Sequence, residues 1–200
     1  MDAAAKPSNL NIANVLTVIR IVGVPFFGWF LLTQDGESVG MRVTAWVAFA
    51  LLMITDRIDG DLARKYDLVT NFGKLADPIA DKALTGMAFV GLSIIGQLWW
   101  WVTIVVLVRE WGITLMRFAI KKYGVMPASQ GGKVKTMLQA LALGGYILPF
   151  EIWNNPFTDV MLGITHVLMA AAVAVTLWTG VLYIRDARTI RRESKAAASS

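Results

Sequence analysis

The sequence predicts an all-α integral membrane protein that crosses the bilayer six times, with both termini in the cytoplasm. Apolar residues make up 56% of the 200-residue chain, whereas a soluble domain reaches about 45–50% even with glycine counted. Charged residues make up only 16%, against about 25% in an average domain. This composition excludes a disordered chain, and the absence of cysteine excludes disulfides and thiolate metal sites. We expect a single domain over residues 1–200, with short flexible tails at about 1–8 and 193–200.

The apolar residues gather in six stretches that are long enough to cross a membrane. A helix needs about 20 mostly apolar residues to span the hydrocarbon core. Apart from Arg42 at its outer boundary, the second stretch is charged only in its last turns, and the third is charged only in its first turns. The expected spans are Ile12–Thr33, Met41–Leu62, Lys74–Gly96, Trp99–Ile120, Lys133–Phe150 and Phe157–Ile184.

The basic residues fall almost entirely on one side of these six spans. Of the 19 Lys and Arg residues, only Arg42 lies in a loop on the opposite side. Because cytoplasmic loops carry the excess of Lys and Arg, this side is expected to face the cytoplasm. Trp99, Trp100 and Trp101 then lie at the outer boundary, where aromatic belts form. The sequence therefore predicts a multi-pass protein of the inner (cytoplasmic) membrane.

Aspartate residues gather where the second and third spans meet on the cytoplasmic side. Asp56 and Asp59 are three residues apart and Asp77 and Asp81 are four apart, so each pair shares one helix face. A short connection makes the two helices antiparallel neighbours. The four side chains, which we call the carboxylate cluster, can then converge. Asp61 lies in the same stretch, and we assign it no role.

Four carboxylates in one place repel one another strongly, and a bound cation relieves that repulsion. All-oxygen ligand sets select hard ions, so we expect an ion such as Mg²⁺, Mn²⁺ or Ca²⁺. Gly60, Ala63 and Gly73 are small enough to let a phosphate approach, and Arg64 offers it a planar fork. Together these residues indicate metal-assisted phosphoryl transfer. The alternative is a structural network of ion pairs with Arg57, Arg64, Lys74 and Lys82.

This stretch resembles the signature of the CDP-alcohol phosphatidyltransferase family, D-x2-D-G-x2-A-R-x8-G-x3-D-x3-D. The fixed positions are all present, as Asp56, Asp59, Gly60, Ala63, Arg64, Gly73, Asp77 and Asp81. The resemblance implies a membrane enzyme, usually a homodimer, that transfers the phosphatidyl group of CDP-diacylglycerol to an alcohol and releases CMP. It implies that the carboxylate cluster holds one or two divalent ions, Mg²⁺ or Mn²⁺, and that Asp81 is also the general base. It also implies CDP-diacylglycerol contacts from Gly60, Ala63, Arg64, Thr70 and Gly73.

A second group of charges, which we call the basic cluster, lies further along the chain. Arg109 and Arg117 are two turns apart in the fourth span, and Lys133 and Lys135 open the fifth. An arginine at membrane depth needs a partner or an anionic ligand. The cluster therefore predicts a pocket for an acceptor that itself carries a phosphate. Pairing of Arg109 with Glu110 for purely structural reasons is the alternative.

The region around the basic cluster, together with the start of the first span, resembles the bacterial phosphatidylglycerophosphate synthases within that family. The similar stretches are Asn11–Thr17 with Arg20 and Pro25, Arg109–Thr114 with Arg117, Pro127–Ser129, and Gly132–Thr136 with Gln139. The resemblance implies sn-glycerol 3-phosphate as the acceptor and Arg109, Arg117, Lys133 and Lys135 as ligands of its phosphate. It also makes Asn11, Asn14 and Thr17 candidates for binding CDP-diacylglycerol. Ordinary helix capping is the alternative for the asparagines.

Two other functions stay open at this point. Relatives that use inositol phosphate, phosphatidylglycerol or serine as the acceptor share the carboxylate signature. A cation transporter also carries carboxylates at membrane depth, but here they gather at one membrane face and no inverted repeat is evident. The expected partners are CDP-diacylglycerol, sn-glycerol 3-phosphate, membrane lipids and a second copy of the chain, and we expect no nucleic acid.

Overall fold

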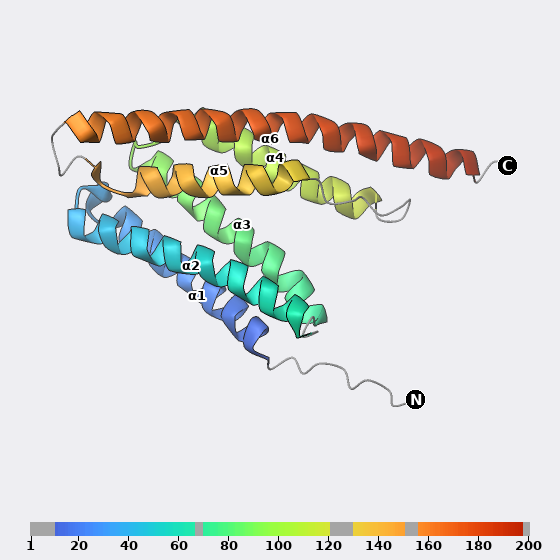
Figure 1. The fold of residues 1–200 in the computed structure, drawn as a ribbon, viewed down its shortest axis with the longest axis horizontal. Helices are drawn as coiled ribbons and strands as arrows, with labels where there is room; N and C mark the ends of the chain where they lie inside the picture. Colours follow the sequence, from blue (N-terminus) through green and yellow to red (C-terminus); the bar gives the residue numbers. More distant parts are fainter. Residues whose placement is uncertain (1–10, 67–69, 121–129, 151–155, 198–200) are drawn as a thin grey trace. The chain divides into compact units, whose positions relative to one another are not determined.

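The computed structural model describes residues 11–66, 70–120, 130–150 and 156–197, except for the side chains of 61–64, 71, 74, 75, 130 and 195–197. Within these ranges every regular element is helical, as the sequence predicts (Figure 1). The elements are α1 (Ile12–Leu32), a 3₁₀ helix η1 (Thr33–Gly36), α2 (Val39–Lys65), α3 (Asn71–Ile94), α4 (Trp100–Ile120), α5 (Gln130–Ile147) and α6 (Pro156–Ala197). Each α-helix covers one predicted span, and α6 continues past its expected end at Ile184.

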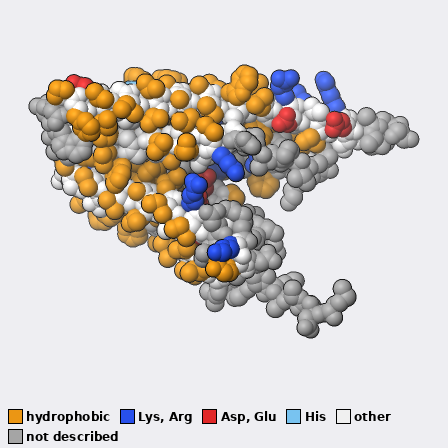
Figure 2. Space-filling view, viewed as in Figure 1, with side chains coloured by type: hydrophobic (Ala, Val, Ile, Leu, Met, Phe, Trp, Pro, Cys, Tyr) orange, Lys and Arg blue, Asp and Glu red, His pale blue; other side chains and the backbone are white. Residues whose placement is uncertain are grey.

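The surface of the described helices is strongly apolar. Within the described part of the chain, three segments are long and apolar enough to cross a membrane, namely Ile12–Gly36, Val39–Gly60 and Pro156–Ser194. Large apolar side chains are exposed, among them Trp29 at 62% and Trp178 at 67%, and Figure 2 shows hydrophobic side chains over much of the visible surface. Soluble monomers rarely expose apolar patches of this extent. The structure therefore supports a membrane protein, and crossing by all six helices stays a prediction.

The chain divides into two compact units. The first comprises residues 1–97 and 146–154, and the second comprises residues 98–145 and 155–200. In the first unit α1 packs against both α2 and α3, and its core includes Phe27, Leu31, Phe89 and Leu92, which are fully buried. The polar site described below lies where α1 meets these two helices.

The second unit contains α4, α6 and nearly all of α5, and α4 packs against α6. Val106, Leu143 and Thr176 are buried in it. Helices α5 and α6 approach closely at Gly145, where an added Cβ would lie 2.5 Å from Oγ1 of Thr165. Any side chain at this position would push the two helices apart.

Arg42 has a structural role that the sequence did not reveal. It lies in the first turns of α2 and is only 5% exposed. Its guanidinium donates to the carbonyl oxygens of Tyr146 at 2.8 Å, Ile147 at 3.2 Å and Leu148 at 3.4 Å. These carbonyls end α5, and a cation satisfies such unpaired acceptors and the negative end of the helix dipole. The single basic residue on the predicted outer side is therefore explained as a helix cap.

Candidate active site

In the first unit, helix α1 presents a row of buried polar side chains to the carboxylate-bearing helices. Asn14, Thr17 and Arg20 are spaced three residues apart, and their exposures are 4%, 1% and 0%. Such spacing places them on one face of a helix that is otherwise apolar. Buried polar groups need partners, and the partners of these three lie on α2, on α3 and at the start of α3.

Arg20 bridges the two aspartates of α2. Its Nη1 lies 2.7 Å from Oδ1 of Asp56, and its Nη2 donates to Oδ2 of Asp59. Asp59 is only 3% exposed, whereas the side chain of Asp56 is 37% exposed. One guanidinium therefore joins a buried carboxylate to one that reaches the surface of the unit.

The other two polar residues of α1 contact the N-terminal half of α3. The hydroxyl of Thr17 donates to Oδ1 of Asp77 at 2.6 Å. The amide of Asn14 donates to Oγ1 of Thr70 at 2.9 Å. Thr70 is the N-cap of α3, and its Oγ1 also accepts from the backbone N–H of Gly73 at 3.0 Å. Helix α1 thus holds both the start of α3 and its first aspartate.

Gly73 makes this close contact between α1 and α3 possible. A Cβ at this position would lie 2.9 Å from Oδ1 of Asn14 and 3.4 Å from Oγ1 of Thr70. It would also lie 3.7 Å from Oδ2 of Asp77. The glycine therefore leaves space beside the second oxygen of Asp77, whose first oxygen is bound by Thr17.

The predicted site residues of this unit are brought together in part. The two pairs of the carboxylate cluster lie on α2 and α3, and both helices pack on α1. Asp81 is half-buried on α3, and its own carbonyl accepts from the hydroxyl of Thr85 at 2.9 Å. Gly60 is half-buried on α2. The side chains of Ala63 and Arg64 lie outside the described residues.

Asn11 has the capping role that the sequence left open. It is the N-cap of α1, and its side-chain oxygen accepts from the backbone N–H of Asn14 at 2.9 Å.

Among the residues that the structure describes, no three acidic, histidine or cysteine side chains form a group able to hold a metal ion. The donor chemistry nevertheless fits a hard divalent cation, because every candidate ligand is a carboxylate oxygen.

In the second unit, Glu110 is the centre of the basic cluster. Its Oε1 accepts from Nη1 of Arg109 at 2.9 Å and from Nζ of Lys135 at 2.6 Å. Arg109 also donates through Nη2 to Oγ1 of Thr179 at 2.7 Å. One carboxylate and one hydroxyl therefore tie together α4, α5 and α6.

Tyr183 of α6 supports the two arginines of the cluster. Its hydroxyl accepts from Nη2 of Arg117 at 3.0 Å, and the guanidinium carbon of Arg117 lies 4.9 Å from the centre of its ring. The guanidinium carbon of Arg109 lies 5.8 Å from the same ring. Both distances fall within the usual range for attraction between a cation and an aromatic ring. Lys133, the fourth cation, is exposed on α5.

The cations of this cluster differ in the donors that they still offer. Both terminal nitrogens of Arg109 are used within the unit, and its buried Nε has no hydrogen-bond partner among the described residues. Lys135 is 8% exposed and uses one of its three donors on Glu110. Arg117 and Lys133 are exposed. The cluster therefore combines Arg109, whose terminal nitrogens are paired within the unit, with cations that can still reach an anion.

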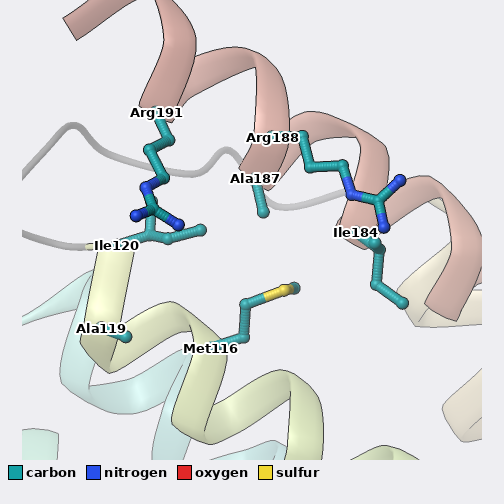
Figure 3. Close-up of a pocket in the computed structure, with 7 residues that line it drawn as sticks. All are labelled: Met116, Ala119, Ile120, Ile184, Ala187, Arg188 and Arg191. Atoms are coloured by element: carbon teal, nitrogen blue, oxygen red, sulfur yellow. The ribbon is translucent and has the colours of Figure 1, made fainter. Parts of the chain in front are cut away.

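A separate open pocket of about 430 Å³ lies between the C-terminal parts of α4 and α6 (Figure 3). Apolar side chains, including Met116 and Ile120, line its floor, and Arg188 and Arg191 line its edge. None of the predicted site residues lines this pocket.

Sequence reasoning missed Arg20, Thr179 and Tyr183 as parts of the site, and it treated Glu110 only as a possible structural partner. Arg20 could have been found, because a charged residue within an apolar span needs a partner. Tyr183 and Thr179 carry no comparable signal, since both residue types are common in membrane helices.

Comparison with known proteins identifies the family of this chain. The sequence model of the CDP-alcohol phosphatidyltransferase family matches residues 10–178. A protein of Mycobacterium tuberculosis named "Probable phosphatidylglycerophosphate synthase" is 48% identical over 188 residues, which cover 94% of this chain and 86% of that protein. The "CDP-diacylglycerol--glycerol-3-phosphate 3-phosphatidyltransferase" of Bacillus subtilis is 35% identical over 165 residues, 76% of this chain and 86% of its own length.

A more distant relative carries a different activity in its name. The "Cardiolipin synthase (CMP-forming)" of Streptomyces coelicolor is 27% identical over 188 residues, which cover 94% of this chain and 87% of that protein. The family match extends over most of the chain and includes the residues of the carboxylate cluster. The protein thus belongs to the CDP-alcohol phosphatidyltransferase family.

Proposed function

We propose that this protein transfers the phosphatidyl group of CDP-diacylglycerol to sn-glycerol 3-phosphate and releases CMP. The observation that carries the proposal is the set of family-signature aspartates in the first unit, of which α1 holds Asp56, Asp59 and Asp77 through Arg20 and Thr17. The acceptor follows from the basic cluster of the second unit. The names of two relatives, 48% and 35% identical, favour the same acceptor.

The carboxylate cluster is the proposed metal site. Asp56, Asp59, Asp77 and Asp81 would hold one or two Mg²⁺ or Mn²⁺ ions through oxygen atoms only. A bound ion would neutralise charge on the pyrophosphate and on the leaving phosphate. The protein's own contribution is to hold the ligands in place, and the bonds from α1 support this role.

The proposed reaction is a substitution at the phosphorus that carries diacylglycerol. The acceptor hydroxyl oxygen forms a bond to this phosphorus, the bond to the bridging oxygen of the pyrophosphate breaks, and CMP leaves with the bonding pair. Asp81 takes the hydroxyl proton, since attack requires a base within hydrogen-bond reach. Asp81 lies one helical turn after Asp77 and so shares its face of α3.

Binding of CDP-diacylglycerol is proposed for the residues around the start of α3. Gly60, Ala63, Arg64 and Gly73 would lie against its headgroup. Asn11, Asn14, Thr17 and Thr70 use their side chains within the first unit. We therefore propose that Asn14, Thr17 and Thr70 shape the binding site by holding α1 and α3 together, and that Asn11 contributes by capping α1.

Binding of the acceptor phosphate is proposed for the basic cluster. Lys135 retains donors beyond its bond to Glu110, and Arg117 and Lys133 are exposed. Arg109 would act mainly through its charge and its Nε, because both terminal nitrogens are already bonded. The four cations and Glu110 together carry +3, which suits a phosphate with two negative charges.

The test of this function is acceptor-dependent release of CMP by the purified protein. We expect CMP release with CDP-diacylglycerol and sn-glycerol 3-phosphate in Mg²⁺ or Mn²⁺, and none in EDTA. Activity with inositol phosphate, serine or phosphatidylglycerol, but not with sn-glycerol 3-phosphate, would overturn the choice of acceptor. Cation flux into liposomes without CMP release would favour a transporter instead.

The role of Asp81 has its own test. We expect Asp81→Asn to lower kcat by at least about 100-fold, since general bases contribute about 10²–10⁴-fold, and to leave the Tm in detergent unchanged. Asp186→Asn is the matched control, because Asp186 is exposed on α6. Near wild-type turnover by Asp81→Asn would show that another group accepts the proton.

The proposed location and assembly are also testable. We propose six crossings, with both termini and the site facing the cytoplasm, and a homodimer. Because the chain has no cysteine, single cysteines at Gln97 and Arg191 can report sidedness in intact cells. An impermeant thiol reagent should modify the cysteine at 97 and spare the one at 191. Light scattering in detergent should give the mass of two chains.

A further inference from the structure

We propose that Arg20 is a permanent cation within the carboxylate cluster and the positioning residue for Asp56 and Asp59. This inference rests on the proposed function, since it treats both aspartates as metal ligands. It adds a residue that lies outside the aspartate signature, on a different helix. Arg20 would set how strongly the cluster depends on divalent ions.

The burial of Arg20 supports this role. The side chain is 0% exposed, and burying a guanidinium is unfavourable unless acidic groups pair with it. Its two terminal nitrogens reach aspartates one helical turn apart on α2. A planar, always charged fork can bridge two carboxylates in this way, whereas a lysine ammonium is a single point of charge.

The contacts from Arg20 also orient the two carboxylates. Arg20 contacts Oδ1 of Asp56 and Oδ2 of Asp59, which is one oxygen of each carboxylate. The contact fixes the direction of each group while its second oxygen is not used by Arg20.

The net charge of the carboxylate cluster also supports a role for Arg20. The four carboxylates carry −4, and Arg20 lowers this to −3. Two divalent ions then leave the cluster at +1, which favours an anionic pyrophosphate, whereas without Arg20 they would leave it at zero. Arg20 therefore reduces the repulsion that bound cations must relieve, and it adds positive charge when they are present.

The test is thermal unfolding of the full-length protein in detergent, with EDTA or with saturating Mn²⁺. We expect Arg20→Gln to lower the Tm by roughly 10 °C in EDTA, because it leaves a buried carboxylate without its cation. Mn²⁺ should recover at least half of this loss, since it supplies the missing positive charge. Arg57→Gln is the matched control, because Arg57 is an exposed arginine on α2 next to Asp56. The Tm of this variant should equal that of the wild type.

A second variant covers the case in which Arg20→Gln does not fold. Arg20→Lys keeps the charge but cannot bridge both aspartates, so we expect about half of the Tm loss and a smaller recovery by Mn²⁺. An unchanged Tm in EDTA, or a loss that Mn²⁺ does not reduce, would overturn the inference for either variant.

Failure of this inference can be told apart from failure of the proposed function. CMP release is measured on the same preparation of the wild-type protein. If Mn²⁺ recovers the Tm of the variant but the wild type releases no CMP, the proposed reaction fails and the role of Arg20 stands. If the wild type releases CMP and the recovery is absent, the role of Arg20 is refuted alone.

Discussion

Replacement of Glu110 by glutamine tests whether the basic cluster is a built phosphate site. Glu110 accepts from Arg109 and Lys135 through a single oxygen, at 2.9 Å and 2.6 Å. The side chains of the two cations are each 10% exposed, and that of Glu110 is 20% exposed. Glu110→Gln keeps the size and one acceptor oxygen but removes the charge that holds both cations.

The magnitude follows from the burial of these groups. Removing one partner of a buried ion pair costs about 3–5 kcal/mol. Because Glu110 retains some contact with solvent and glutamine can still accept one hydrogen bond, we expect a loss of about 2–3 kcal/mol in the free energy of unfolding. For a chain of this length, that corresponds to a decrease in Tm of about 4–12 °C.

The KM for the acceptor shows whether Glu110 holds the cations in position or competes with the phosphate for them. Lys135 is held in place by Glu110, and its flexible stem would otherwise sample many rotamers. We therefore expect the KM for sn-glycerol 3-phosphate to rise about tenfold, or roughly 1.4 kcal/mol of binding, while the KM for CDP-diacylglycerol stays the same. A lower KM for the acceptor would refute this reasoning, because it would mean that Glu110 competes with the phosphate.

The prediction for Glu110→Gln is checked by enzyme kinetics and thermal unfolding. CMP release is measured against the concentration of each substrate, and the Tm is measured in the same detergent. Glu193→Gln is the matched control, since Glu193 is exposed on α6, and it should change neither quantity.

Three further predictions follow from individual contacts. Tyr183→Phe keeps the ring beneath Arg117 but loses the 3.0 Å hydrogen bond, so the KM for the acceptor should rise by about two- to threefold, against about tenfold for Tyr183→Leu. Gly73→Ala places a Cβ 2.9 Å from Oδ1 of Asn14 and should lower both the Tm and CMP release, at a cost of about 1–3 kcal/mol. Arg42→Met removes the donors that cap α5 and should lower the Tm by several degrees with both KM values unchanged.

Long apolar stretches made the helices predictable. Each predicted span corresponds to one α-helix. A stretch of about 20 apolar residues between polar loops favours a helix, because a helix satisfies all backbone hydrogen bonds within the segment. The end of α6 was not predictable in the same way. Beyond Ile184 the sequence is rich in arginine, so the apolar signal stops although the helix continues to Ala197. The division into two compact units was not predictable either, since one of its boundaries falls within α5 after Gly145, where the sequence shows no break.

The site was predictable where spacing carries the information. Asp56 and Asp59, and again Asp77 and Asp81, form a pattern that can be read along one helix. The contacts made by α1 join residues that are 39 to 60 positions apart, and no local pattern encodes such a pairing. Only the charge of Arg20 within an apolar span gave a signal, and it identified a residue in need of partners without saying which they are.

The two charged clusters share one principle of construction. In the first unit a cation, Arg20, lies among acidic groups, and in the second an acid, Glu110, lies among bases. In each case the single opposite charge binds two members of its cluster and lowers their mutual repulsion. With four like charges and one opposite charge each, the proposed metal and phosphate sites would keep net charges of −3 and +3, so each would still attract a ligand of opposite sign. A site with full internal neutralisation would be more stable but would bind neither a metal ion nor a phosphate, and for this reason we expect Arg20→Gln and Glu110→Gln to alter binding as well as stability.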